Sequence, residues 1–143
     1  MSAALDVNVL VYASNRSAPE QERAQALITE LVRGPELLFL FWPVIMGYLR
    51  VATSPTVVPV PRSAIEIMDN VGAILSRPHV RTPGEADGFW EIYRSTGGDQ
   101  ARGKLVTDAH IAALMRQHGV RVIYTRDRDF RRFDGIEPVD PFD

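Results

Sequence analysis

Apolar residues follow two alternating patterns along the chain. Nearly continuous apolar runs, typical of buried strands, occupy the opening from Ala3 to Tyr12, then Leu37 to Phe41 and Val120 to Tyr124, and Ile136 to Val139 predicts a last, short edge strand. Between these runs the apolar residues recur every three or four positions, which is the spacing of one helix face. The sequence therefore predicts strands separated by helices.

Capping signatures indicate where three of the helices begin. A Ser or Thr followed three residues later by Glu can satisfy two backbone N–H groups at a helix N-terminus. This signature occurs at Ser17–Glu20, Ser63–Glu66 and Thr82–Glu85. Two further helices are expected, one starting near Pro43 and one from Asp108 to Gln117.

The alternation of strands and helices predicts an α/β fold. Strands that are joined through helices form a parallel sheet, and the helices cover both of its faces. With 143 residues and 45% hydrophobic residues, the chain is expected to form one domain, 1–143, that buries roughly two-thirds of its unfolded surface.

Three acidic residues stand where the pattern gives them no evident structural role. Asp6 lies inside the first apolar run, Asp108 opens the last helix, and Asp127 follows the run that ends at Tyr124. Charged groups at the ends of buried elements must be solvated, paired or metal-bound to offset their desolvation. Because ligands gather at the carboxyl ends of parallel strands, these acids are expected to converge on one carboxylate metal site.

Composition limits the location and the partners of the protein. The chain has no cysteine, so disulfides and thiol catalysis are excluded, and a reducing, cytoplasmic location is expected. No basic segment precedes an apolar stretch at the N-terminus, and the apolar run 37–49 is too short to span a membrane. A net charge of −2 means that any RNA binding depends on local arginines and bound metal.

A cluster of carboxylates suits Mg²⁺ or Mn²⁺, because hard cations take oxygen ligands and need several negative charges. A bound cation of this kind can polarise a phosphodiester and activate water. Asn8 is expected to hydrogen bond to a metal-binding carboxylate without adding charge. Thr125, two residues before Asp127, is expected to orient a water or a phosphate oxygen.

Three segments resemble the motif blocks of PIN-domain nucleases, and specifically those of the VapC toxins of bacterial toxin–antitoxin pairs. They are Leu5–Leu10, Thr107–Leu114 and Tyr124–Phe130, in this order. The resemblance implies a PIN-like α/β/α sandwich with a central, mostly parallel sheet, and a Mg²⁺- or Mn²⁺-dependent endoribonuclease. Its substrate would be structured RNA (tRNA or rRNA), whose cleavage inhibits translation or growth. It further implies a homodimer and a cognate VapB-like antitoxin. The catalytic and metal-binding acids of the family fall on Asp6, Asp108 and Asp127.

The chain departs from the family pattern at two places in the site. Gly47 stands where a second acid is usual, before Tyr48-Leu49-Arg50, and Lys104 precedes the third acid where a small polar residue is usual. Lys104 either offers positive charge to the scissile phosphate or is simply solvated. Asp129 is the nearest further acid. In an extended segment it would lie on the same face as Asp127, whereas a turn there would point it elsewhere.

Simpler interpretations stay open for each residue. Asp108 can act only as a helix cap, Asp127 and Asp129 as turn residues, and Asp6 as the partner of a buried arginine. At the level of the whole protein, the alternatives to a nuclease toxin are a catalytically weak or inactive PIN fold that binds RNA or antitoxin, which Gly47 motivates, and a phosphatase with Asp6 as the nucleophile. The phosphatase is disfavoured because Asn8 replaces the second acid of an Asp-x-Asp motif.

Overall fold

A five-stranded parallel sheet forms the centre of the protein. The computed structural model describes residues 2–143, and its strands are β1 (Ser2–Leu5), β2 (Leu37–Phe39), β3 (Val80–Arg81), β4 (Val122–Tyr124) and β5 (Glu137–Val139). They lie in the order β3-β2-β1-β4-β5, and every neighbouring pair is parallel. The chain starts at the central strand, extends the sheet on one side through β2 and β3, and then returns to the other side. The order of the strands therefore reverses beside β1, where open parallel sheets bind ligands.

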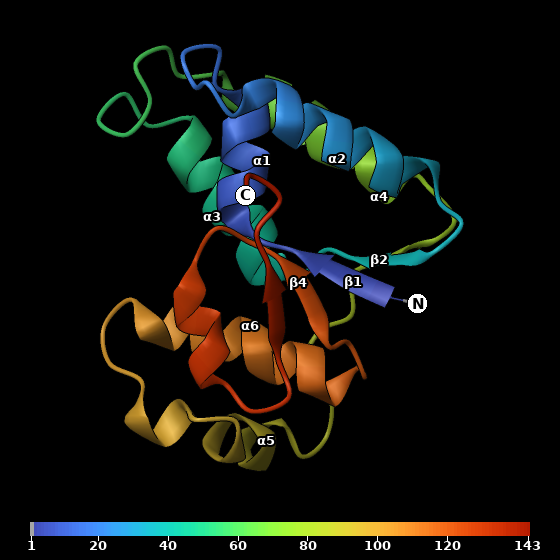
Figure 1. The fold of residues 1–143 in the computed structure, drawn as a ribbon, viewed down its shortest axis with the longest axis vertical. Helices are drawn as coiled ribbons and strands as arrows, with labels where there is room; N and C mark the ends of the chain where they lie inside the picture. The colour runs from blue at the N-terminus through green and yellow to red at the C-terminus, as the bar shows by residue number, and fades with distance from the viewer. Residues whose placement is uncertain (1) are drawn as a thin grey trace.

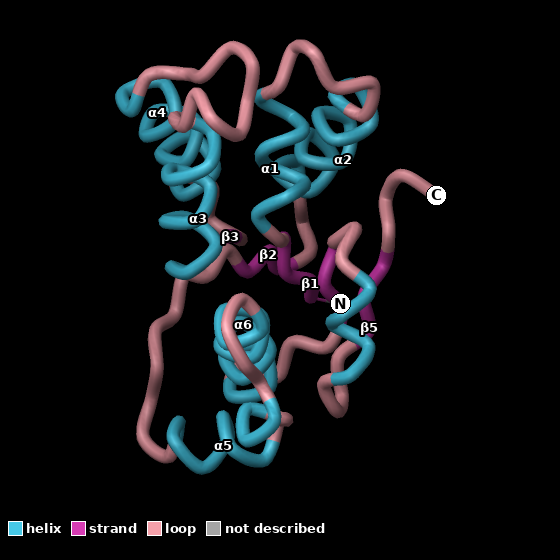
Figure 2. Tube along the Cα trace, turned by 90° about the vertical axis from the view of Figure 1, so that its left-hand side faces the viewer, coloured by secondary structure: helices cyan, strands magenta, loops and turns pink. Residues whose placement is uncertain are grey.

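Helices cover both faces of this sheet. They are α1 (Val7–Ser14), α2 (Gln21–Arg33), α3 (Trp42–Ala52), α4 (Ala64–Leu75), α5 (Phe89–Ser95) and α6 (Leu105–Gln117), with short 3₁₀ turns η1 (Gly98–Gln100) and η2 (Arg128–Arg132). Helices α1 to α4 lie on one side of the sheet and α5 and α6 on the other (Figures 1 and 2). This arrangement confirms the predicted α/β/α sandwich and its parallel sheet. No helix among the described residues is long and apolar enough to cross a membrane.

The core lies on both sides of the central strands. Leu5, Leu38 and Ile123 of the sheet are at most 1% exposed, and they pack with Tyr48 of α3 and Ile111 of α6. Because both faces of the sheet are covered, its strands are apolar without alternation, as the sequence pattern predicted.

The first strand is shorter than its apolar run suggested. It ends at Leu5, and Val7–Ser14 forms helix α1 instead of extending the strand. Asp6 causes the change, because its carboxylate accepts a hydrogen bond of 2.7 Å from the Val7 backbone N–H and caps the helix. An apolar run alone does not separate a buried strand from a buried helix.

Only one of the three capping signatures forms as predicted. At α4 the Glu66 backbone N–H donates to Ser63 Oγ at 3.2 Å, and the Ser63 hydroxyl donates to the Glu66 carboxylate at 3.3 Å. Helices α2 and α5 begin later, at Gln21 and Phe89, because in both cases the signature lies in the preceding loop. Strand β3 was not predicted, since it has two residues and is held mainly by backbone hydrogen bonds to β2.

Candidate metal centre

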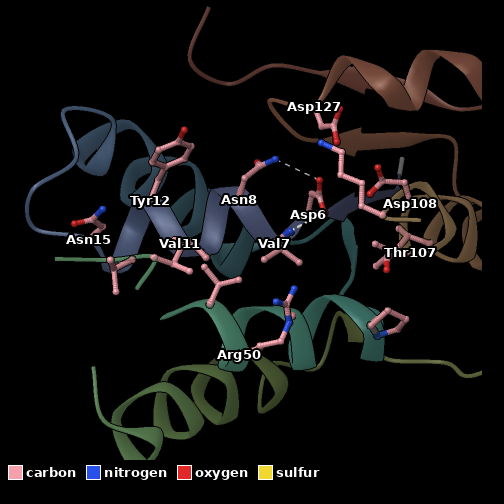
Figure 3. A pocket seen from close by; sticks show the side chains of 17 residues that line it. Asp6, Val7, Asn8, Val11, Tyr12, Asn15, Arg50, Thr107, Asp108 and Asp127 are labelled. Atoms are coloured by element: carbon pink, nitrogen blue, oxygen red, sulfur yellow. Dashed lines mark hydrogen bonds between the residues drawn. The ribbon is translucent and has the colours of Figure 1, made fainter. Parts of the chain in front are cut away.

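A cavity of about 530 Å³ opens at the carboxyl ends of β1 and β4. Asp6 enters it from the end of β1, Asp108 from the first turn of α6, and Asp127 from the loop after β4. Figure 3 shows the three carboxylates gathered at one end of the cavity. The three predicted acids thus line one cavity, at the point where the strand order reverses, and their convergence on one cation stays a prediction.

Asp6 is held in place by its neighbours. It is 6% exposed, and Oδ2 accepts hydrogen bonds from the Thr125 hydroxyl at 2.7 Å and from the Asn8 amide at 3.4 Å. Burial is the main cause that raises the pKa of Asp6 above its usual range, and the charge of Asp127 adds to it. None of these partners is an arginine, so the alternative of a buried ion pair is wrong. Asp6 nevertheless has a structural role that sequence reasoning missed, because it caps α1.

Asn8 and Thr125 hold Asp6 and Asp127 in position through hydrogen bonds. The Thr125 hydroxyl donates to Asp6 and accepts from the Asn8 amide at 3.1 Å and from the Asp127 backbone N–H at 2.9 Å. Its donor and both of its acceptor positions are thus used, and the residue is 1% exposed. The Asn8 amide thus hydrogen bonds to the Asp6 carboxylate, as expected, and the metal-binding role of Asp6 stays a prediction. The expectation that Thr125 orients a water or a phosphate is wrong, because Thr125 holds Asp6 and Asp127 instead.

The tightest group of carboxylates includes Asp129, whose direction the sequence left open. Oxygen atoms of Asp108, Asp127 and Asp129 lie within 4.8 Å of one another. A turn does follow Asp127, since Asp127 Oδ1 accepts a hydrogen bond of 2.9 Å from the Asp129 backbone N–H. This turn brings Asp129 toward Asp108, whereas Asp6 lines the same cavity but lies outside the tight group.

The pKa of Asp108 is also raised by its surroundings. Burial, followed by the charges of Asp127 and Asp6, raises the pKa of Asp108 from its usual 3.8 to about 7. Helix α6 begins at Leu105, three residues earlier than predicted, so Asp108 is not the helix cap. Its carboxylate is instead placed among other acids, as expected of a group that binds a cation.

Gly47 lies in α3 where this helix crosses α1. A Cβ atom at this position would lie 2.8 Å from Val7 Cγ2, which is closer than side chains pack. Gly47 therefore permits a close contact between α1 and α3. It also leaves the site without the second acid that is usual in the family. One turn further along α3, the exposed side chain of Arg50 also lines the cavity. Arg50 was not predicted, although it stands three residues after Gly47 on the same helix face.

The arginines after β4 differ in their environments. The Arg126 guanidinium pairs with Glu20 and lies over the rings of Tyr12 and Phe142, at 5.7 and 5.6 Å from their centroids. Arg132 is 3.7 Å from Asp129, and Arg128 and Arg131 are exposed. Arg126 is thus held by contacts within the protein, whereas Arg128 and Arg131 are exposed; none of these arginines lines the cavity that holds the acids.

Lys104 lines the cavity and is exposed at the start of α6, which agrees with either role that the sequence allowed. The apolar side chains of Leu27 and Leu31 on α2 and of Ile45 on α3 pack against the core and offer little surface to a partner. Trp42 and Trp90 are 48% and 69% exposed, so neither is a core residue.

The donor set fits a hard divalent cation. Three carboxylates offer oxygen atoms within 4.8 Å of one another, and a fourth, from Asp6, lines the same cavity. Mg²⁺ and Mn²⁺ prefer such oxygen ligands. Burial and then the charges of the neighbouring carboxylates raise the pKa of Asp108, and a bound cation would offset the repulsion between these charges.

Comparison with known proteins places the chain in a family. The PIN domain profile matches residues 3–136. The chain is 48% identical to Ribonuclease VapC48 of Mycobacterium tuberculosis, over 99% of its own length and 99% of the relative's. It is 31% identical to VapC ribonuclease Mb2897 of Mycobacterium bovis, over 97% of its own length and 95% of the relative's.

Solved structures share the fold at low sequence identity. VapBC2 from Rickettsia felis, bound to a DNA fragment from the promoter, superposes with a TM-score of 0.68 at 15% identity, covering 97% of this chain and 98% of the matched one. VapC20 from Mycobacterium tuberculosis, a sarcin–ricin loop cleaving toxin, gives 0.63 at 18% identity, covering 95% and 99%. From the profile match and the full-length relatives, the chain belongs to the PIN domain family and, within it, to the VapC family.

Proposed function

We propose that this protein is a Mg²⁺- or Mn²⁺-dependent endoribonuclease that acts as the toxin of a toxin–antitoxin pair. The observation that carries the proposal is the crowding of carboxylates from β1, α6 and the loop after β4 at the end of one cavity. The substrate is a structured RNA, and cleavage of a tRNA or rRNA would inhibit translation. The chain would act as one PIN domain, residues 1–143, in the cytoplasm.

The acids have different parts in this proposal. Asp108, Asp127 and Asp129 would hold the cation, since their oxygen atoms already lie within 4.8 Å of one another. A bound divalent cation supplies positive charge to the scissile phosphate and makes water easier to deprotonate. Asp6 adds a fixed negative charge beside them, and Thr125 keeps its carboxylate oriented through the 2.7 Å hydrogen bond.

The basic residues of the cavity would bind the phosphate backbone. Lys104 and Arg50 line the cavity together with Asp108, and neither side chain has an ion-pair partner among residues 2–143. Free cations beside an acidic cluster attract a polyanion that the net charge of −2 would otherwise repel. They can also hold the RNA chain in position while the acids hold the cation.

The relatives support RNA as the substrate and an antitoxin as the partner. Two full-length relatives are named ribonucleases, and one structural neighbour is a VapBC complex. We infer that a VapB-like antitoxin and a second copy of the chain cover exposed apolar side chains. Met46, Ile65 and Met68 on α3 and α4, and Trp90 on α5, are between 57% and 71% exposed and are candidates for these contacts.

The test is a cleavage map of total cellular RNA, made with purified protein and with or without Mn²⁺. We expect discrete cuts that need the cation and that disappear in Asp108→Asn and Asp127→Asn. Asp99→Asn, in the exposed turn η1, is the control and should cleave like the wild type. Equal cutting by all variants without a cation would reject the nuclease assignment. Cation binding without any cutting would favour the alternative, an inactive PIN fold that binds RNA or antitoxin.

A further inference from the structure

The cavity is larger than a cation site requires. Six waters around a cation would fill roughly 180 Å³, since each takes about 30 Å³ in the liquid. The cavity holds about 530 Å³, which is in the range of small-molecule pockets. The remaining space lies away from the acids, along helix α1, and must have another occupant or only water.

One stripe of α1 forms the wall of this remaining space. Val7, Val11 and Asn15 follow one another at four-residue spacing, so they lie on the same side of the helix, and all three line the cavity. In Figure 3, Asn15 stands at the end of α1 far from Asp6, and Val11 lies between them. From Val7 to Asn15 the helix rises about 12 Å, at about 1.5 Å per residue. The stripe therefore leads from the acids to a polar end.

A second group of residues that line the cavity is apolar and carries a positive charge. It consists of Val51 of α3, Val57 of the following loop, and Arg50. At the far end, Asn15 Oδ1 accepts a hydrogen bond of 3.0 Å from the Ser17 backbone N–H, which fixes the orientation of its amide. The Asn15 amide N–H groups have no partner among residues 2–143, so they can donate to a ligand.

We propose that this part of the cavity is a base-selecting subsite, in which a nucleobase of the RNA lies between Val11 and Val57 and presents a hydrogen-bond acceptor to Asn15. The inference rests on the nuclease function proposed above and adds the residues that would set its sequence preference. A flat apolar ring with a polar edge fits the two valine walls and the fixed amide. Arg50 is placed to meet the phosphate of the same nucleotide.

A peptide is the other occupant that apolar walls could accept. Arg50 and Lys104 argue against it, because a basic segment drawn to the acids would meet two unpaired cations in the same cavity. A nucleotide carries the opposite charge and pairs with them. We therefore assign the subsite to RNA.

The test measures binding and needs no cleavage. Four labelled RNA trinucleotides that differ only in the central base are titrated into metal-free protein, and the spread of their Kd values is compared between variants. Asn15→Asp keeps the acceptor for Ser17 N–H but replaces the free donor by an acceptor. We expect the ratio of tightest to weakest Kd to change by about tenfold, which is within the discrimination of a base contact. Asn70→Asp on α4, outside the cavity, introduces the same charge and should leave the ratio unchanged.

A second pair of variants tests the apolar wall. Val57 and Val60 lie in the same loop and are 57% and 61% exposed, but only Val57 lines the cavity. Val57→Asp should weaken all four trinucleotides by about tenfold relative to Val60→Asp, because it places a charge beside the base and repels the phosphate. Equal Kd values for all bases, or equal effects of the two loop variants, would overturn the subsite. So would a loss of partner binding in Val57→Asp without any change in RNA affinity. Base-selective binding by a protein that cuts no RNA would keep the subsite and reject the nuclease function.

Discussion

The contact between Gly47 and Val7 makes a quantitative prediction about the missing acid. A Cβ at position 47 would approach Val7 Cγ2 to 2.8 Å, so Gly47→Ala should strain the packing of α1 on α3. Overpacking of this kind lowers the free energy of unfolding by about 1–3 kcal/mol, whereas replacing glycine by alanine inside a helix raises it by about 1 kcal/mol. The net loss of stability is expected to be about 1 kcal/mol in the wild-type background.

Val7→Ala removes the methyl groups that cause the clash and therefore supplies the matched background. Urea unfolding of Val7→Ala, Gly47→Ala and the double variant forms a double-mutant cycle. We expect a coupling of about 1–3 kcal/mol, because in the Val7→Ala background the new Cβ meets no methyl group and only the helix gain remains. Additive effects of the two substitutions would show that the close contact does not require glycine.

The same background permits a fair test of the fourth carboxylate. Gly47→Glu alone would combine a new ligand with a clash, and a failure would be uninformative. In Val7→Ala the glutamate can turn into the cavity, and one more charge about 4 Å from a cation contributes between about 1 and 4 kcal/mol, depending on the local dielectric. We therefore expect Mn²⁺ to bind at least about fivefold more tightly to Val7→Ala/Gly47→Glu than to Val7→Ala, as measured by calorimetry. An unchanged affinity would refute the view that position 47 faces the cation. RNA cleavage that appears only with the glutamate would make the natural protein a binder.

Three further predictions concern the acids and their support. Because the folded-state pKa of Asp108 is raised from 3.8 to about 7, the metal-free folded protein holds an extra proton in this window, so its stability should fall as pH rises through it. Urea unfolding at pH 5 and pH 8 should show this fall in the wild type and a smaller one in Asp108→Asn. Mn²⁺ should raise the melting temperature of the wild type more than that of Asp129→Asn, with Asp99→Asn as the control; equal shifts would exclude Asp129 from the site. Phe142→Ala removes one ring from Arg126 and should lower the free energy of unfolding, and the loss should be smaller in an Arg126→Ala background, where only the packing of Phe142 on Tyr12 and the core is lost.

The sequence was sufficient to predict the layers of the fold and the place of the acids. Asp6 and Asp127 follow the buried runs of β1 and β4, and these two strands pair directly, with Ala4 opposite Ile123. A parallel pair necessarily brings both carboxyl ends to the same edge of the sheet, so two of the acids could be placed together without coordinates. Asp108 could be added because it lies in the first turn of the helix that leads into β4. Such a helix starts at the edge of the sheet where the parallel strands end.

Other features depend on geometry that no short pattern records. The turn after Asp127 directs Asp129 toward Asp108, and only the hydrogen bond from the Asp129 N–H to Asp127 Oδ1 defines that turn. The role of Gly47 depends on the distance between two helices. Thr125 looked like a ligand-orienting residue from its spacing, but its hydroxyl is fully used within the protein.

The positions of Gly47 and Asp129 together bear on whether the site has lost an acid. Four carboxylates still belong to it, because Asp129 joins Asp108 and Asp127 within 4.8 Å and Asp6 lines the same cavity. A hard cation responds to the number and reach of its oxygen ligands, not to the element that supplies them. Asp129 reaches the site from the loop after β4, so α3 needs no ligand of its own and can pack closely on α1 through Gly47. The glycine is therefore compatible with the proposed site, in which Asp129, from the loop after β4, would supply the fourth charge.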